Sequence, residues 1–178
     1  MMAAEHTHPR PRGTTMTTEH DELRTLIADL EAQAPTLELT RFTEDDAWAV
    51  GSWLWETARE RDLPIAVSIR RGEHRLFHAS RPGTSADNDA WIERKERLVR
   101  RYEVASFLLS RRFALSGQRL EDVGLDPLLH AAAGGCVPVT VTGVGMVGTV
   151  TVSGLHQADD HALVVEALRV LQRVNSPA

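Results

Sequence analysis

The sequence predicts one α+β domain organised around a largely antiparallel sheet. Its 178 residues are a usual length for a single domain and are enough to bury a sizeable core. Runs that alternate apolar and polar residues follow one another through short glycine-containing turns, whereas parallel strands need long helical crossovers. Apolar residues spaced three or four apart at both ends predict amphipathic helices. Together these patterns favour helices packed on an antiparallel sheet.

The first third of the chain predicts a helix, a short strand and a second helix. Apolar residues recur at helical spacing over residues 20–33, and Ala34-Pro35 ends that pattern. Residues 36–41 alternate two leucines with polar neighbours, as a short strand does. Thr43 stands three residues before Asp46 and is placed to cap a second helix. Three tryptophans on that helix predict core or subunit-interface packing more than ligand stacking. They are Trp48, Trp53 and Trp55.

The middle of the chain predicts a hairpin followed by a charged helix. Residues 65–69 and 76–79 are β-rich and flank the turn at Arg71-Gly72-Glu73. A helix capped at Ser85 or Asp87 then runs to about Tyr102 and continues or kinks into the apolar residues that follow. Its Glu and Arg residues are spaced for local ion pairs, so most of its charge is expected to face solvent. Residues 120–133 predict a short helical connection.

The last third predicts a second hairpin and a final helix. Valines alternate with threonines over residues 137–142 and again over 146–153. The glycines between them match the dinucleotide fingerprint G-x-G-x-x-G, from Gly143 to Gly148. That fingerprint needs a helix to start within the glycines, and a β-branched run follows here instead, so we expect a hairpin turn and no nucleotide. Asp159 or Asp160 caps the final helix.

Composition excludes several classes of function. Twenty Lys and Arg against 25 Asp and Glu give a net charge of -5, which disfavours nucleic acid and anionic membrane as partners. One cysteine, Cys136, fits a reducing compartment and a small core side chain. The N-terminus has no apolar segment typical of a signal peptide, so we expect a cytoplasmic protein. Residues 1–18 are expected to form a disordered tail, and residues 19–174 the single domain.

Two groups of side chains could carry chemistry. Asp160-His161 stands at a helix start, where the carboxylate is explained by capping and the imidazole is the best single candidate for proton transfer. Arg94 and Lys95, with two nearby arginines, give the charged helix a basic side that could hold a carboxylate or phosphate, although solvated charge is the default. The histidines lack metal-site spacing, so no metal site is predicted. Ser153 lacks the G-x-S-x-G motif of serine hydrolases.

An ordered set of motifs resembles the GlcG/HbpS-like haem-degrading-domain family, and within it the small cytosolic branch catalogued as an uncharacterised protein family. The motifs, which span roughly residues 31–171, are Trp91 with Arg94-Lys95, then Gly134-Gly135 with Pro138, then Gly148-Thr149-Val150 through Ser153-Gly154-Leu155, and finally Asp160-His161. The chain departs from the family by placing Cys136-Val137 before Pro138, where an aromatic is usual. It also has Ala34-Pro35 where an acidic residue is expected.

The resemblance implies a five-stranded antiparallel sheet packed by helices, a homo-oligomer and a haem cofactor. It also implies ligand-binding roles for Trp91, Arg94, Lys95, Gly134, Gly135, Ser153 and Gly154, with Asp160 and His161 as catalytic candidates. Three functions stay open at this point. The first is haem binding or degradation. The second is a non-enzymatic assembly or partner-binding role, and the third is a small-molecule acid–base enzyme that uses His161 with the Arg94 and Lys95 side.

Overall fold

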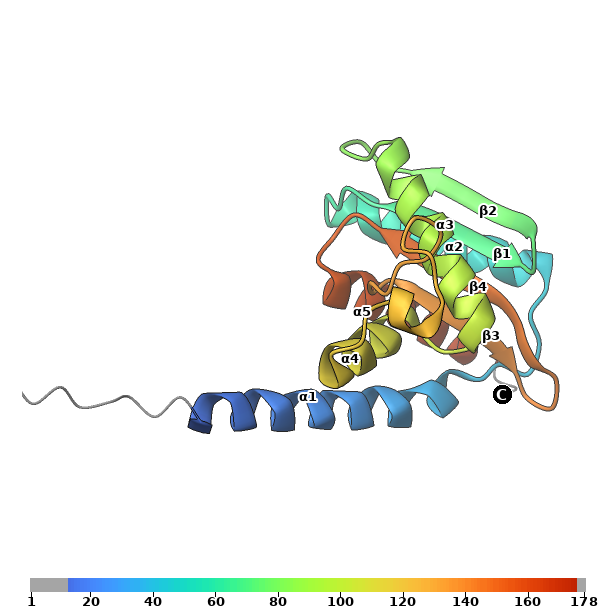
Figure 1. Cartoon of the computed structure of the whole chain (residues 1–178). Coiled ribbons are helices and arrows are strands. Elements are labelled where there is room, and N and C mark those ends of the chain that lie inside the picture. Colours follow the sequence, from blue (N-terminus) through green and yellow to red (C-terminus); the bar gives the residue numbers. More distant parts are fainter. Residues whose placement is uncertain (1–12, 176–178) are drawn as a thin grey trace, which may run out of the picture.

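A computed structural model describes residues 13–175 and contains a four-stranded sheet in the order β2-β1-β4-β3. Its strands are β1 (Ala66–Arg71), β2 (His74–Ser80), β3 (Cys136–Val141) and β4 (Gly145–Ser153). The pairs β1/β2, β3/β4 and β1/β4 are all antiparallel. Two hairpins are therefore joined side by side through their β1 and β4 strands. This arrangement confirms the α+β class and the antiparallel sheet (Figure 1).

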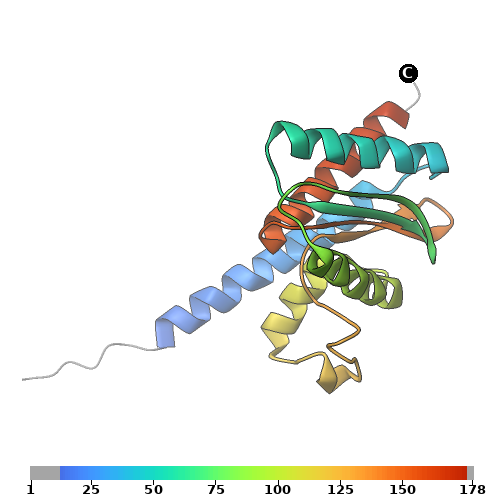
Figure 2. The same ribbon diagram turned by 90° about the horizontal axis from the view of Figure 1, so that it is seen from above.

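Helices cover both faces of the sheet (Figure 2). On one face lie α2 (Glu44–Glu60) and α5 (Gln157–Asn175), and on the other lie α3 (Ala86–Tyr102) and α4 (Ser106–Ser116). Two of the predicted caps are confirmed, and in the first Thr43 and Asp46 exchange backbone and side-chain hydrogen bonds at the start of α2. Ser85 caps α3 in the same way. Gly143 and Gly145 adopt φ values of 76° and 97° in the β3–β4 turn, so the glycine motif is a hairpin turn as predicted.

The two faces of the sheet differ in polarity. Val150 and Val152 of β4 point into an apolar core that also takes side chains from α2 and α5. Thr149 and Thr151, which alternate with them, are fully buried on the opposite side. There Thr151 meets Glu96 of α3. The α3 face is therefore a buried polar layer, and it contains several of the residues that the sequence singled out.

The expectation of five strands is wrong by one strand. Residues 34–37 form a short 3₁₀ helix, η1 (Ala34–Leu37), with proline near its start. Only Leu39 then pairs with the sheet: its N–H donates to Thr140 O at 2.9 Å, and its carbonyl accepts from Thr142 N at 2.9 Å. This parallel bridge joins Leu39 to Val141, the last residue of β3. The proline-initiated turn leaves too little extended chain for a strand.

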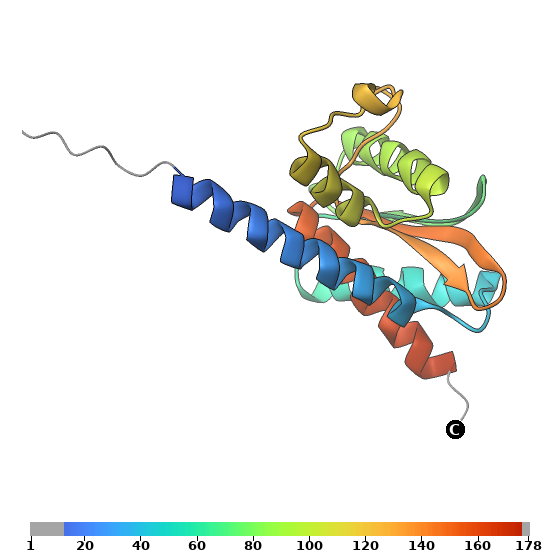
Figure 3. The ribbon, with the colours of Figure 1, turned by 60° about the horizontal axis from the view of Figure 1, so that its bottom comes forward.

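The helix α1 (Gly13–Gln33) begins earlier than the predicted start at residue 20. Residues 1–12 of the tail that was expected to be disordered lie outside the described part of the chain. Extending an existing helix costs far less than nucleating one, which explains the longer helix. Its N-terminal half projects beyond the body of the molecule (Figure 3). The charged helix ends at Tyr102 as predicted, but it neither continues nor kinks into the following apolar residues: Glu103 takes a left-handed φ of 55°, and α4 is a separate helix.

The predicted helical connection after α4 is mostly irregular. Within residues 120–133 the structure has one short 3₁₀ helix, η2 (Glu121–Val123). Gly124 follows with a left-handed φ of 73°, which ends the helical turn. No helix in residues 13–175 is long and apolar enough to cross a bilayer.

Candidate functional site

Lys95 occupies the centre of the buried polar layer. Its side chain is 2% exposed, and its Nζ donates to Gly134 O at 2.9 Å and to Val152 O at 2.6 Å. Asp160 Oδ2 lies 3.6 Å from the same nitrogen. Burial lowers the pKa of Lys95, while the Asp160 carboxylate opposes that shift. Lys95 therefore ties α3 to β4, to the chain before β3 and to the start of α5.

Asp160 also holds the turn that leads from β4 into α5. Its Oδ1 accepts a hydrogen bond from Leu155 N at 3.0 Å, and the backbone of Gly154 donates to the same carboxylate. Burial nevertheless raises the pKa of Asp160 to about 6. The carboxylate thus interacts with Lys95 and with backbone amides of the preceding turn, which is an anchoring role. The prediction that Asp159 or Asp160 caps the final helix is wrong, because α5 begins at Gln157 and both residues lie within its first turn.

The predicted glycines are needed because the chain passes close to this cluster. Gly135 has a φ of 111°, and a Cβ there would lie 2.7 Å from Lys95 Nζ and 2.8 Å from Asp160 Cβ. A Cβ on Gly134 would collide with the Gln157 carbonyl group. Ser153 is buried, and its carbonyl accepts from Asn88 Nδ2 at 3.2 Å. Six of the predicted site residues therefore meet in one closed cluster: Lys95, Gly134, Gly135, Ser153, Gly154 and Asp160.

Glu96 is a buried residue that the sequence analysis placed on a solvated face. It is 1% exposed, and its carboxylate meets Arg70 Nε at 2.7 Å and accepts from Ser68 Oγ at 2.8 Å. The expectation that the charge of this helix faces solvent is therefore wrong for Lys95 and Glu96. The available signal for Lys95 was its spacing of three and four residues from Leu98 and Val99, which are buried on the same side of the helix.

Cys136 belongs to the same layer and behaves as a core side chain. Thr151 Oγ1 donates to its Sγ at 3.1 Å, and its backbone exchanges two hydrogen bonds with Ser106 Oγ. Burial raises the pKa of the thiol to about 12, so the thiol stays protonated and unreactive at neutral pH.

Trp91 and Arg94 lie apart from this cluster, on the outer side of α3. The Arg94 guanidinium stacks over the Trp91 ring, 4.1 Å from its centroid, and both side chains are partly exposed. Arg94 Nε donates to Ala90 O within its own helix. The structure therefore satisfies these two residues locally, while Lys95 next to them points inward.

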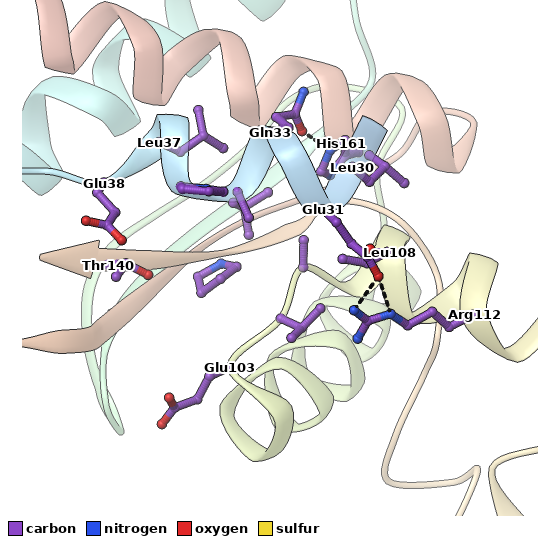
Figure 4. A pocket seen from close by; sticks show the side chains of 16 residues that line it. Leu30, Glu31, Gln33, Leu37, Glu38, Glu103, Leu108, Arg112, Thr140 and His161 are labelled. Carbon is purple, nitrogen blue, oxygen red and sulfur yellow. Dashed lines mark hydrogen bonds and ion pairs between the residues drawn. The ribbon is translucent and has the colours of Figure 1, made fainter. Parts of the chain in front are cut away.

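His161 lines a different feature, a cavity of about 420 Å³ (Figure 4). The cavity lies between the end of α1, η1, the start of α4, β3 and α5. Most of its wall is apolar, from Leu30, Pro35, Leu37, Val104, Ala105, Leu108, Val137 and Pro138. A volume of this size falls within the range of about 300–1,000 Å³ that is usual for small-molecule sites.

His161 is one of the polar residues that line this cavity. Its Nε2 lies 2.9 Å from Gln33 Oε1, and its ring lies 5.2 Å from that of Phe107. Because the amide oxygen only accepts, Nε2 is assigned the proton and Nδ1 the lone pair. Nδ1 is buried and has no hydrogen-bond partner in the described part of the chain. Burial lowers the pKa of His161 to about 4, so the imidazole is neutral at pH 7.

The rim of the cavity carries more acidic than basic groups. Glu31 and Arg112 form an ion pair at 2.6 Å, seen in Figure 4 as two dashed lines. Glu38 and Glu103 add two further carboxylates to the lining. An anionic group of a ligand is therefore disfavoured at this mouth.

Asp160 and His161 are neighbours in sequence but face different surroundings. Adjacent helical residues point about 100° apart, so Asp160 turns to Lys95 while His161 turns to α1 and α4. The lining of the His161 cavity includes neither Arg94 nor Lys95, and it includes none of the four predicted glycine and serine residues. The acid–base hypothesis required these groups in one cavity, and the geometry does not provide it. Among residues 13–175, no three His, Cys, Asp or Glu side chains gather into a group able to hold a metal ion.

Comparisons with known proteins place the chain in a family. The family model described as "Haem degrading protein HbpS-like" matches residues 42–169. A UPF0303 protein of Streptomyces coelicolor is 57% identical over 143 residues, which cover 80% of this chain and 90% of that protein. A UPF0303 protein of Zymomonas mobilis is 40% identical over 145 residues, covering 81% of this chain and 78% of that protein.

Solved structures show the same fold. The Ybr137w protein superposes with a TM-score of 0.76 at 27% identity, covering 83% of this chain and 88% of that one. HbpS gives a TM-score of 0.57 at 20% identity, with coverages of 79% and 94%. A complex of PduOC with haem gives 0.61 at 16% identity, with coverages of 72% and 93%. The chain belongs to the HbpS-like haem-degrading family.

Proposed function

We propose that this chain binds haem in the cavity between α1, α4, β3 and α5, with His161 as the iron ligand. The observation that carries the proposal is a neutral, buried imidazole set in an apolar cavity of about 420 Å³. Neutral imidazole is the form that binds iron, and an apolar slot is what a porphyrin ring needs. Membership of the HbpS-like family and the likeness to a haem complex support the choice of ligand.

The residues present fit an apolar ring, and His161 could hold its iron. Leucine, valine and proline side chains on both sides of the cavity would exclude water from the ring. His161 Nε2 would become available to iron once the Gln33 side chain moves and the imidazole proton shifts from Nε2 to Nδ1, because the only described partner of Nε2 is Gln33 Oε1. Gln33 is half-buried and is the last residue of α1, so its side chain can move without unfolding the helix. Bound haem would supply the redox and oxygen chemistry, which the family name associates with haem breakdown.

Hemin titration tests the proposal directly. Adding hemin to the wild-type chain should produce a saturable Soret shift, and His161→Ala should abolish or strongly weaken it. His156→Ala is the matched control, because His156 is exposed and lies in the turn before α5. Loss of the Soret band with ascorbate would extend the function from binding to degradation. Wild-type and His161→Ala spectra that are identical would rule out His161 as the ligand.

A second candidate function is homo-oligomeric assembly, the partner-binding alternative. It is favoured by α1, whose N-terminal half projects from the body, and by Trp48, which is 66% exposed beside Phe77. A large exposed aromatic on a helix is typical of an interface. Light scattering after size-exclusion chromatography should give a multimer, and Trp48→Ala or Trp53→Ala should reduce its mass. A wild-type monomer would refute this assembly.

We also propose a cytoplasmic location, to be checked by cell fractionation.

A further inference from the structure

A second hollow of about 340 Å³ lies on the other side of the Gln33–His161 pair. Gln33 and His161 line both this hollow and the apolar cavity described above. The hydrogen bond of 2.9 Å between them therefore stands where the two spaces meet. The far wall of the second hollow is the outer side of α5, including Arg169 and Arg173.

Arg169 and Arg173 are free to bind an anion. They are four residues apart on α5, so they share one side of the helix, and both are exposed. In the described residues, neither guanidinium lies within 4.0 Å of a carboxylate oxygen as an ion pair. Glu166, the acidic residue of this lining, is already engaged by Arg61 through two hydrogen bonds of 3.0 and 3.1 Å. The hollow therefore has a net positive wall.

The two openings of the combined space carry charges of opposite sign. The mouth of the apolar cavity carries Glu31, Glu38 and Glu103 against Arg112, and Arg112 is paired with Glu31. The α5 side carries the guanidinium groups of Arg169 and Arg173, which have no ion-pair partner among residues 13–175. A ligand with an apolar body and acid groups on one edge would thus be repelled at the first mouth and attracted at the second.

Gln33 acts as the partition between the two spaces. It ends α1, is half-buried, and contributes its side chain to both linings. A movement of its amide away from His161 would remove the side chain that lies between the apolar cavity and the basic hollow. With the imidazole proton shifted to Nδ1, the same movement would leave Nε2 of His161 free.

We propose that Arg169 and Arg173 bind the carboxylate groups of the ligand whose apolar body occupies the α1–α4 cavity, which rests on the proposed function. This assigns a ligand class, flat apolar molecules with acid groups along one edge, and two specificity-determining residues on α5. For haem, the acid groups are the two propionates.

The test compares haem with its dimethyl ester, in which both propionates are uncharged, in the same buffer and cosolvent. Binding is followed by Soret absorbance for the wild type and for the double variant Arg169→Gln/Arg173→Gln. Arg59→Gln is the matched control, an exposed arginine on α2. The double variant should bind haem on the order of tenfold more weakly, as two partly exposed charge pairs would give, and should bind the ester as the wild type does. Added NaCl should weaken haem binding by the wild type and leave ester binding unchanged.

The outcomes separate this inference from the proposed function. Equal haem affinity in the wild type and the double variant, with His161→Ala defective, would overturn the role of the two arginines and leave the haem site standing. Failure of both porphyrins to bind the wild type would overturn the haem site itself. Weaker binding of both porphyrins by the double variant would also contradict the inference, because the arginines would then act through the fold. Thermal unfolding of each variant accompanies the titrations, and the exposed positions predict unchanged midpoints.

Discussion

Replacing Lys95 with methionine tests whether the buried polar layer holds the fold together. Methionine has nearly the length of lysine without its charge, so the packing is largely kept. The change removes the donor to Gly134 O and Val152 O and leaves Asp160 without the ammonium 3.6 Å away. Each orphaned buried acceptor costs about 1–3 kcal/mol, and breaking a buried ion pair by removing one partner costs about 3–5 kcal/mol. We expect a loss of about 3–5 kcal/mol in the free energy of unfolding.

The loss should depend on pH through Asp160. Its pKa is already raised to about 6 from an ordinary value of 3.8, and removing Lys95 raises it further. A carboxyl group whose pKa is raised in the folded state stabilises the fold most at low pH and loses that contribution as pH rises through the folded pKa. Lys95→Met should therefore be most destabilised at pH 8 and should recover part of the loss at pH 5.

The assay is urea unfolding followed by tryptophan fluorescence and circular dichroism. Asp160→Asn keeps an oxygen acceptor for the Leu155 amide, so it should cost less than Lys95→Met. The double variant should be more stable than the sum of the single losses implies, by about 1–3 kcal/mol. Arg97→Met, which removes a partly exposed pair with Glu93 on the same helix, should change stability by less than about 1 kcal/mol. A Lys95→Met loss under about 1 kcal/mol, or one unaffected by Asp160→Asn, would refute the reasoning.

Three further predictions follow from single contacts. Gly135→Ala should destabilise by about 2–4 kcal/mol, since its Cβ would collide with the backbone oxygen of Val152 and would lie 2.7 Å from Lys95 Nζ. Gly72→Ala has open space and should cost about 1 kcal/mol, and equal losses in urea would contradict this reasoning. The free energy of unfolding of the wild type should fall by about 3 kcal/mol as pH drops from 6.5 to 4, because His161 is protonated at a higher pH in the unfolded chain than in the folded one. His161→Gln should lack this part of the pH dependence. An equal loss of stability in acid for both proteins would exclude His161 as its source. Gln33→Ala should raise haem affinity up to about tenfold, because it removes the hydrogen-bond partner of His161 Nε2. Hemin titration measures this change. A loss of binding would instead mean that Gln33 contacts the ligand.

The fold was largely predictable because its signals are local. The Thr43 cap, the alternation of valines and threonines, and the hairpin glycines each depend on neighbouring residues, and the structure places all of them as expected. The fifth strand was not predictable in the same way. The alternation of Leu37 and Leu39 with polar residues is compatible with a strand. The 3₁₀ turn that contains Pro35 takes up residues 34–37, however, and only Leu39 then pairs with the edge strand β3.

The candidate site was predictable only in part, because its members meet through long-range packing. Lys95, Gly134 and Asp160 are separated by 39 and 26 positions in the sequence, and only the antiparallel sheet brings them together. The Gln33–His161 pair joins residues 128 positions apart. Gln33 carried no signal of its own, since a glutamine at the end of an amphipathic helix is usually a solvated residue.

The start of α5 shows how one short motif serves two purposes. Asp160 anchors the helix by accepting backbone amides and Lys95, which fixes the direction of the next residue. His161 is thereby held against Gln33 and the apolar cavity rather than against the polar layer. A change that loosens the Lys95–Asp160 anchor should consequently disturb ligand binding at His161 without touching the cavity wall. Haem affinity in Asp160→Asn, measured where the variant is fully folded, therefore tests whether the anchor positions the proposed ligand.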